Sequence, residues 1–109
     1  MKKTFGKTFS ERVVELALSV LAGRVTTYGA LARAAGGGAM ASQSITSILG
    51  RAYGKGEKKI PFHRIVYSDG RVWLGEYEKE RRALYKKEKI EIDEKGKIKN
   101  FRDKLFDFG

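Results

Sequence analysis

The 109-residue sequence contains no cysteine and only one histidine, His63. Without cysteine the chain cannot form a disulfide, present a thiolate nucleophile or hold a metal through thiolates. One histidine is too few for a histidine-built zinc site, so we expect neither a metal nor another cofactor. Any chemistry would have to come from this histidine, carboxylates, hydroxyls or lysines, and a binding function is therefore the simpler expectation.

Long apolar runs are also lacking. No stretch approaches the roughly 20 apolar residues that a membrane-spanning helix needs, and the basic start at residues 1–4 is not followed by the apolar core of a signal peptide. We therefore expect a cytoplasmic protein with no membrane partner. The length fits one domain over residues 1–109, which we expect to be a monomer.

Acidic residues are scarce beside basic ones. The chain has 23 lysines and arginines against 13 acidic residues, which gives a formal net charge of +10. Such an excess favours a polyanionic partner, with nucleic acid first and an anionic membrane surface second. A heat-adapted surface would explain the density of charge but not its sign.

Hydrophobic spacing predicts three helices in the first half of the chain. Residues 8–22 carry apolar side chains at helical intervals, and Gly23 supplies a stop. Thr27 is a good N-cap for a second short helix, which the three glycines at 36–38 should end. A third helix is expected over residues 40–53.

The third predicted helix has one apolar stripe and an outer face of mostly small residues. The stripe consists of Ile45, Ile48, Leu49 and Ala52. The outer positions are Gln43, Ser44, Thr46, Ser47, Gly50 and Arg51. A face of small side chains lets the backbone approach another surface closely. The pattern resembles a helix-turn-helix, although any three-helix bundle has similar spacing.

The second half predicts short extended pieces and one charged helix. Asp69 and Gly70 form a turn between extended segments, and residues 76–89 form a helix with Tyr77, Leu84 and Tyr85 facing inward. Residues 90–99 suggest a terminal hairpin or wing, and the aromatic tail should pack back onto the body. The expected fold class is mainly α with short β elements.

Two segments carry a resemblance to a known family. Residues 23–32 have the sequence GRVTTYGALA, and residues 61–66 have the sequence PFHRIV. Together they resemble the C-terminal domain of the O6-alkylguanine-DNA alkyltransferases, and the similarity runs over about residues 9–92. Active members have Pro-Cys-His-Arg-Val in the second segment, with the cysteine accepting the alkyl group, whereas this chain has Phe62. The chain is therefore identified as a member of the non-catalytic alkyltransferase-like proteins, which usually have tryptophan there and whose tail after Ile90 is also similar.

The resemblance implies the winged helix-turn-helix fold of the alkyltransferase C-terminal domain and a function in DNA repair, so we expect the protein to be nucleoid-associated. It implies that the protein binds duplex DNA through the minor groove, flips O6-alkylguanine into a pocket and flags it without alkyl transfer. It also implies that the lesion passes to nucleotide excision repair, but the residues themselves identify no repair partner.

The resemblance assigns two sets of site residues. The lesion-binding set is Tyr28, Leu49, Phe62 and Trp73. The DNA-binding set is Thr27, Tyr28, Gln43, Ser44, Ser47, Arg51 and Arg64. Tyr28 would crowd the phosphate of the target nucleotide, and Phe62 would pack against the flipped base. Trp73 fits equally well as a pocket wall or as a core anchor.

Gln43 lies where the family normally has an arginine that fills the gap left by the flipped base. Ser42 is one step away in the register, so the residue that fills the gap stays open between the two. A glutamine can hydrogen-bond the orphaned cytosine but brings no charge. Arg51, two turns further along, is better placed as a phosphate contact.

His63 and Glu88 match the relay that deprotonates the cysteine in active relatives. Without a thiol the relay has no substrate, so we expect His63 to be a structural hydrogen-bonding residue and Arg64 to brace the pocket loop. Tyr67 and Gly75 are expected to border the pocket or the DNA face. The lysines at 55, 58 and 59 are expected to touch phosphates.

Two other functions stay open. One is a winged-helix transcription regulator that recognises a specific DNA sequence. The other is an enzyme, either through an unexpected acceptor residue or because Phe62 was introduced in place of a native cysteine.

Overall fold

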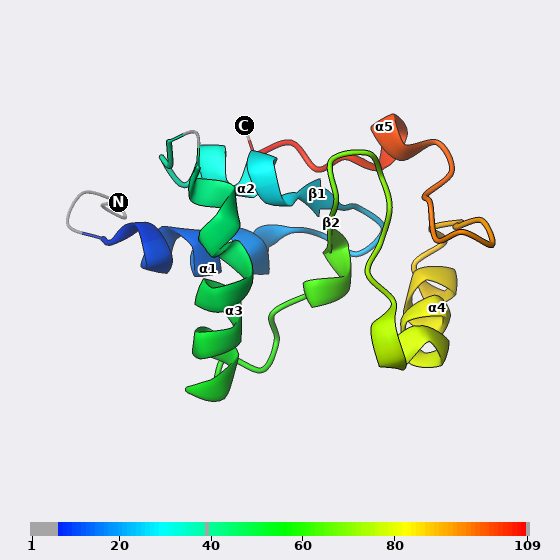
Figure 1. Ribbon diagram of the computed structural model, residues 1–109, viewed down its shortest axis with the longest axis horizontal. Coiled ribbons are helices and arrows are strands. Elements are labelled where there is room, and N and C mark those ends of the chain that lie inside the picture. Colours follow the sequence, from blue (N-terminus) through cyan, green and yellow to red (C-terminus); the bar gives the residue numbers. More distant parts are fainter. Residues whose placement is uncertain (1–6, 39, 109) are drawn as a thin grey trace.

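Helices dominate the first half of the molecule. In this computed structural model, which describes residues 7–38 and 40–108, they are α1 (Phe9–Ser19), α2 (Tyr28–Ala34) and α3 (Ile45–Gly54) (Figure 1). Thr8 begins α1 with a capping box, in which its hydroxyl accepts a hydrogen bond from the Glu11 amide at 3.1 Å and its own amide donates to the Glu11 carboxylate at 2.8 Å. The helix ends earlier than predicted because the backbone is already extended at Val20.

The turn from α2 to α3 depends on glycine. Gly36 has φ +90°, a conformation that favours glycine, and it ends α2 as predicted. A Cβ atom on Gly37 would lie 2.4 Å from the Ala41 Cβ and 2.8 Å from the Phe9 ring, so only glycine fits there. The chain then enters a 3-10 helix, η1 (Ala41–Ser44), before α3 begins. The predicted third helix is therefore 3-10 in its first turn.

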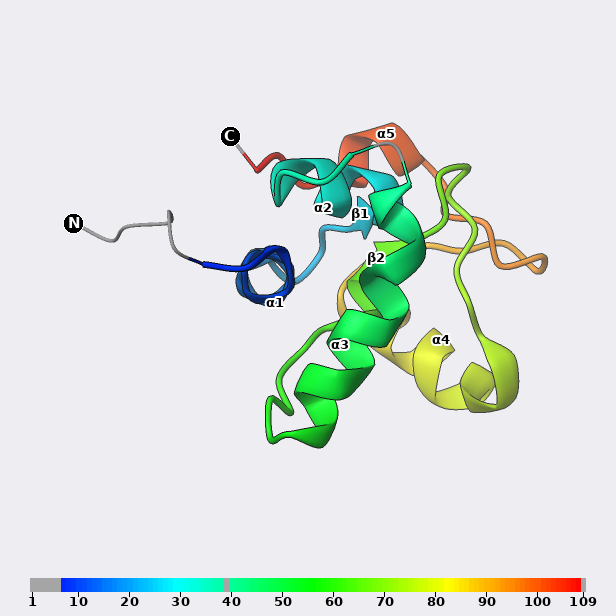
Figure 2. The same cartoon turned by 60° about the vertical axis from the view of Figure 1, so that its left-hand side comes forward.

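A helical core holds α1, α2 and α3 together. Helix α3 crosses in front of α1 in Figure 1, and Figure 2 shows α1 nearly end-on with α3 beside it. The buried residues of this core are Val13, Ala17, Leu31, Ala32, Ala35, Ile45, Ile48, Leu49, Ile60 and Ile65. The apolar stripe predicted for α3 lies here, with Ala52 packed against its edge.

A short parallel strand pair joins the two halves. Strand β1 (Thr26–Thr27) pairs with β2 (Ile65–Val66), with Thr26 opposite Ile65. Successive residues of a strand point to opposite faces. Ile65 accordingly belongs to the helical core, whereas Val66 belongs to a second core on the other side.

The second half contains the predicted helix and hairpin. A 3-10 helix, η2 (Phe62–Arg64), precedes β2, and a further 3-10 turn, η3 (Gly75–Tyr77), leads into α4 (Glu78–Lys87). Antiparallel bridges join Ile92 to Ile98 and Arg71 to Lys97, so the hairpin also pairs with the segment before η3. The second core, called the wing core below, is formed by Val25, Val66, Val72, Tyr85, Ile90 and Ile98.

The inward orientation predicted for Tyr77 and Leu84 is wrong. Tyr77 is 53% exposed and Leu84 is 38% exposed, whereas Tyr85 is 1% exposed as expected. The wing core is small, and residues from the hairpin and the tail fill it, so α4 contributes only Tyr85.

The tail packs back on the body as predicted. It adds a short helix, α5 (Phe101–Lys104), that the sequence did not predict. Phe101 packs on the wing core, and Phe108 packs on the helical core. The fold is thus mainly α with short β elements, a winged helix-turn-helix. Within residues 7–38 and 40–108, no helix combines the length and the apolar character needed to cross a membrane.

Candidate nucleic-acid interface

The four lesion-binding residues predicted from the sequence line one pocket. Tyr28, Leu49, Phe62 and Trp73 surround a space of about 300 Å³, which is within the size range of small-molecule sites. Four further residues complete the lining: Thr46, Ile65, Tyr67 and Arg81. We call this space the aromatic pocket. It is formed by α2, α3, η2, β2, the segment before η3, and α4.

Tyr28 is the first residue of α2, and the cap of that helix fixes its position. The Thr27 hydroxyl accepts a hydrogen bond from the Ala30 amide at 3.0 Å, as the sequence predicted. The half-buried Tyr28 ring lies with its centroid 5.7 Å from the Tyr67 ring. Burial and the neighbouring Tyr67 raise the pKa of Tyr28, against the opposing effects of Thr46 and Arg81. The hydroxyl therefore stays protonated at neutral pH and can donate a hydrogen bond.

Trp73 is a wall of the aromatic pocket and not a core anchor. Its side chain is 44% exposed, and it belongs to neither buried core. The indole lies directly on Gly75, where a Cβ atom would be 2.2 Å from the Trp73 Cζ2 atom. Gly75 also has φ +51°, so two independent features require glycine beside the indole.

Arg81 is a pocket residue that the sequence did not predict. Its guanidinium lies 5.4 Å from the centroid of the Trp73 ring and is the only cation among the eight lining residues. A guanidinium over an indole face gains a cation–π attraction. In the sequence Arg81 stands among many charged residues of one helix, and no local signal distinguishes it from its solvated neighbours.

Phe62 presents its ring to the aromatic pocket from η2. The ring is half-buried and makes an edge contact with Tyr53, with centroids 5.7 Å apart. A phenyl ring has no lone pair or ionisable proton, so it has no atom that could accept an alkyl group. It offers apolar and π contacts only.

Behind Phe62, a charged network joins η2 to the end of α4. The His63 Nε2 atom lies 2.8 Å from a Glu88 carboxylate oxygen, and the Arg64 Nη2 atom donates to the same oxygen at 2.6 Å. The Gly23 amide donates to the other oxygen at 3.1 Å, and Arg64 also donates to the Val20 carbonyl at 3.0 Å. The predicted pairing of His63 with Glu88 is therefore present.

The ionisation states in this network follow from burial and hydrogen bonding. Burial raises the pKa of Glu88, but hydrogen bonds from Arg64, His63 and the Gly23 amide outweigh it and hold the pKa at about 2. Burial lowers the pKa of His63, despite the favourable carboxylate beside it. Because an ionised carboxylate can only accept, the neutral imidazole must donate through its Nε2–H.

The network also anchors the backbone of η2. The Tyr85 hydroxyl donates to the His63 carbonyl at 2.6 Å, and burial raises the pKa of Tyr85 to about 12. Arg64 directs its guanidinium inward to Glu88 and Val20, which agrees with a bracing role. The same geometry gives no support to the expectation that Arg64 contacts DNA.

The outer face of α3 is exposed and low in profile, as predicted. Gln43, Ser44, Ser47 and Arg51 are all exposed, and a Cβ atom on Gly50 would meet nothing within 4 Å. Gln43 lies on η1, just before α3, and is exposed, whereas Ser42 is half-buried. Of the two residues predicted as alternatives for filling the gap, Gln43 is the more exposed.

The basic loop after α3 is exposed throughout. Lys55, Lys58 and Lys59 all reach solvent, and the Lys58 amine lies 4.1 Å from the centroid of the Tyr53 ring. The loop thus continues the exposed face of α3 with positive charge, next to the ring that contacts Phe62.

Comparisons with known proteins place the chain in a family. The family model for the DNA-binding domain of 6-O-methylguanine DNA methyltransferase matches residues 8–95. No curated protein sequence matches the chain.

Two solved structures have a similar fold. The crystal structure of S. pombe Atl1 in complex with damaged DNA containing O6-carboxymethylguanine gives a TM-score of 0.71 at 20% identity, covering 97% of this chain and 99% of that chain. A crystal structure of S. pombe ATL in complex with DNA gives a TM-score of 0.69 at 21% identity, with the same coverage of both chains. The match over most of the sequence and the shared fold lead to one conclusion: this chain belongs to the family of the 6-O-methylguanine DNA methyltransferase DNA-binding domain.

Proposed function

We propose that this protein binds O6-alkylguanine in duplex DNA, holds the flipped base in the aromatic pocket and leaves its alkyl group in place. The observation that carries the proposal is the meeting of Tyr28, Leu49, Phe62 and Trp73 around one pocket. Three of these four side chains are aromatic. Stacking of a base on an aromatic side chain contributes about 1–3 kcal/mol, and flipping costs a few kcal/mol. A planar base has two faces, and one stacked ring on each face would be enough to offset the flip.

We propose that no alkyl transfer takes place, and the residue at the reactive position supports this. Phe62 stands where the active relatives have cysteine, and the whole chain contains no cysteine. The pocket can therefore retain the base without consuming either the protein or the lesion. A protein that keeps the lesion intact acts as a marker, and we propose nucleotide excision repair as the process that removes it.

DNA would approach along the exposed face of α3. The small side chains of Ser44, Ser47 and Gly50 would allow a close approach to the minor groove, and Tyr28 lies beside Thr46 near the start of α3. Gln43 would enter the gap left by the base, and Arg51 and the basic loop would contact phosphates. If ~5 phosphates are neutralised, the log–log slope of affinity against salt is about −4.5.

The experiment that tests this proposal is a competition between O6-methylguanine and unmodified duplexes. We expect the protein to prefer the modified duplex and Tyr28→Ala to lose that preference, because the residue no longer crowds the phosphate. Tyr28→Phe is the matched control, since it keeps the ring and should keep the preference.

Two results would contradict the proposal. Equal affinity for modified and unmodified duplexes, with preference for one base sequence, would identify a transcription regulator. A methyl-sized gain in protein mass after incubation with O6-methylguanine DNA would identify an enzyme.

A further inference from the structure

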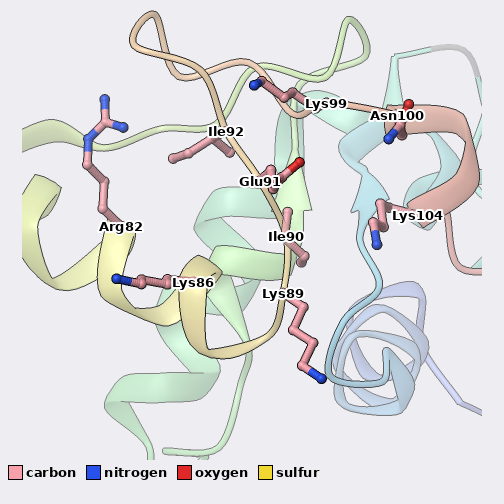
Figure 3. Close-up of a pocket in the computed structure, with 9 residues that line it drawn as sticks. All are labelled: Arg82, Lys86, Lys89, Ile90, Glu91, Ile92, Lys99, Asn100 and Lys104. Carbon is pink, nitrogen blue, oxygen red and sulfur yellow. The ribbon is translucent and has the colours of Figure 1, made fainter.

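A second concave site lies between α4, the hairpin and α5. It has a volume of about 590 Å³, and five cations line it: Arg82, Lys86, Lys89, Lys99 and Lys104. Figure 3 shows these side chains coming from the helix, from the segment that follows it, from the hairpin and from α5. Glu91 is the only acidic residue in the lining. We call this site the basic cleft.

The basic cleft is separate from the aromatic pocket. The two sites share no lining residue. Arg81 and Arg82 are neighbours on α4, but Arg81 lies over Trp73 whereas Arg82 reaches toward the carbonyls of the hairpin turn. Successive residues of a helix point in directions about 100° apart, and Lys86 follows Arg82 one turn later on the same side. The helix therefore presents one face to each site.

The lysines of the basic cleft have no anionic partner within the described residues. Arg82 donates to Glu78 at 2.8 Å, but the amines of Lys86, Lys89, Lys99 and Lys104 make no hydrogen bond or ion pair there. Like charges gathered in one concave site repel one another and focus a positive potential into it. A bound polyanion would relieve that repulsion.

Lys89 occupies a backbone position that favours glycine. It has φ 62° and follows the C-cap of α4, with its amide donating to the Lys86 carbonyl and the Ile90 amide donating to the Tyr85 carbonyl. This is a Schellman motif, in which the left-handed residue is usually glycine. The only other non-glycine residue with positive φ, within the part of the chain described, is Asn100, which also lines the basic cleft. The sequence thus places a charge where the backbone favours no side chain.

The chemistry of the lining favours DNA over an acidic protein. Protein interfaces are depleted in lysine and depend on exposed apolar or aromatic anchors. The cleft offers few anchors, because Ile90 is buried and no aromatic residue lines it. Protein–DNA interfaces are strongly positive, and lysines act there as point charges toward phosphates.

We propose that the basic cleft binds the phosphate backbone of a second DNA duplex, so that a protein bound to one duplex through the aromatic pocket can hold another. The proposal adds a second DNA site to the proposed function. The test keeps the two sites apart, because lesion binding to the first duplex is measured independently.

The test uses two short duplexes with different dyes, one carrying O6-methylguanine and one unmodified, and it detects their joint diffusion by fluorescence cross-correlation. We expect joint diffusion with the wild-type protein. A double variant, Lys86→Gln with Lys99→Gln, should weaken capture of the second duplex by roughly tenfold. The log–log slope of that capture against salt should become shallower by about 1.8, and lesion binding should be unchanged. The control is Lys79→Gln with Lys95→Gln, which removes the same charge from α4 and the hairpin outside the cleft.

Three outcomes would overturn the proposal. The first is the absence of joint diffusion with the wild-type protein. The second is an equal loss of capture in the cleft and control variants, which would indicate general charge attraction. The third is displacement of the second duplex by polyglutamate at lower charge concentration than by DNA, which would indicate an acidic protein partner.

Discussion

The 3-10 helix η2 separates two sites of opposite character. Phe62 faces the aromatic pocket, where exposed rings and a single cation surround an open space. The next two residues, His63 and Arg64, turn into the charged network, where the Glu88 carboxylate accepts hydrogen bonds from both side chains and from a backbone amide. The charged groups of the network pair with one another, whereas the rings of the pocket present apolar and π surface. This difference agrees with the proposal that the network holds the fold together and that the pocket receives the base.

The largest expected effect comes from breaking the network at its centre. Glu88→Gln removes the charge that compensates the half-buried Arg64, and one oxygen acceptor becomes a donor. Removing one partner of a fully buried ion pair costs about 3–5 kcal/mol, and the partial exposure of Arg64 reduces this to about 3 kcal/mol. Urea unfolding should show the loss. Glu76→Gln, at an exposed position, should change the free energy of unfolding by less than about 0.5 kcal/mol. Equal stability of Glu88→Gln and wild type would contradict a structural role for the network.

The same network predicts how stability depends on pH. The pKa of Glu88 is about 2 in the folded protein, below its ordinary value of 4.5, so the unfolded chain binds the proton more readily. The contribution of Glu88 to the free energy of unfolding is complete above about pH 4.5 and is lost as the pH falls toward 2. The pKa of His63 is also lowered, so the contribution of His63 to the free energy of unfolding begins to fall as the pH drops below its ordinary pKa of 6.5.

Urea unfolding from pH 7 to pH 3 measures both contributions. Wild type should lose stability over this range, and the advantage of wild type over Glu88→Gln should shrink most below pH 4.5. An advantage that stays constant down to pH 3 would show that Glu88 is not ionised in the folded protein.

Local chemistry made much of this arrangement predictable from sequence. The Thr27 cap, the glycine turn and the apolar stripe of α3 depend on residues a few positions apart, and all three are present. The similarity of the segment from Pro61 to Val66 to the family also predicted the pairing of His63 with Glu88, which is present in the structure.

Features that depend on long-range packing were not predictable. Arg81 became a pocket residue only because the segment before η3 brings Trp73 under it. Tyr77 and Leu84 appeared inward-facing by spacing, but the wing core was already filled by hairpin and tail residues. The basic cleft likewise gathers lysines that are far apart in the sequence, so charge composition indicated their number and not their place.

An intermediate effect is expected when the aromatic pocket is altered without touching the network. Gly75→Ala places a Cβ atom within the space of the Trp73 indole and should displace that wall. Since base–aromatic stacking contributes about 1–3 kcal/mol, affinity for O6-methylguanine DNA should fall about tenfold. Gly38→Ala is the matched control, because a Cβ atom there meets nothing within 4 Å. Unchanged lesion affinity in Gly75→Ala would contradict a role for Trp73 in binding the lesion.

The smallest effects should distinguish the two neighbours on η2. Phe62→Leu keeps an apolar side chain but loses the ring and its edge contact with Tyr53, which should weaken lesion binding about threefold and leave the pH dependence of stability unchanged. His63→Gln keeps a donor for Glu88 but removes the titrating imidazole, so lesion affinity should hold while the loss of stability between pH 7 and pH 5 disappears. Duplex titrations at pH 7 and urea unfolding at both pH values measure the two quantities in each variant. If each substitution changed both quantities, η2 would couple pocket and network into one site, and the assignment of binding to one side and stability to the other would be wrong.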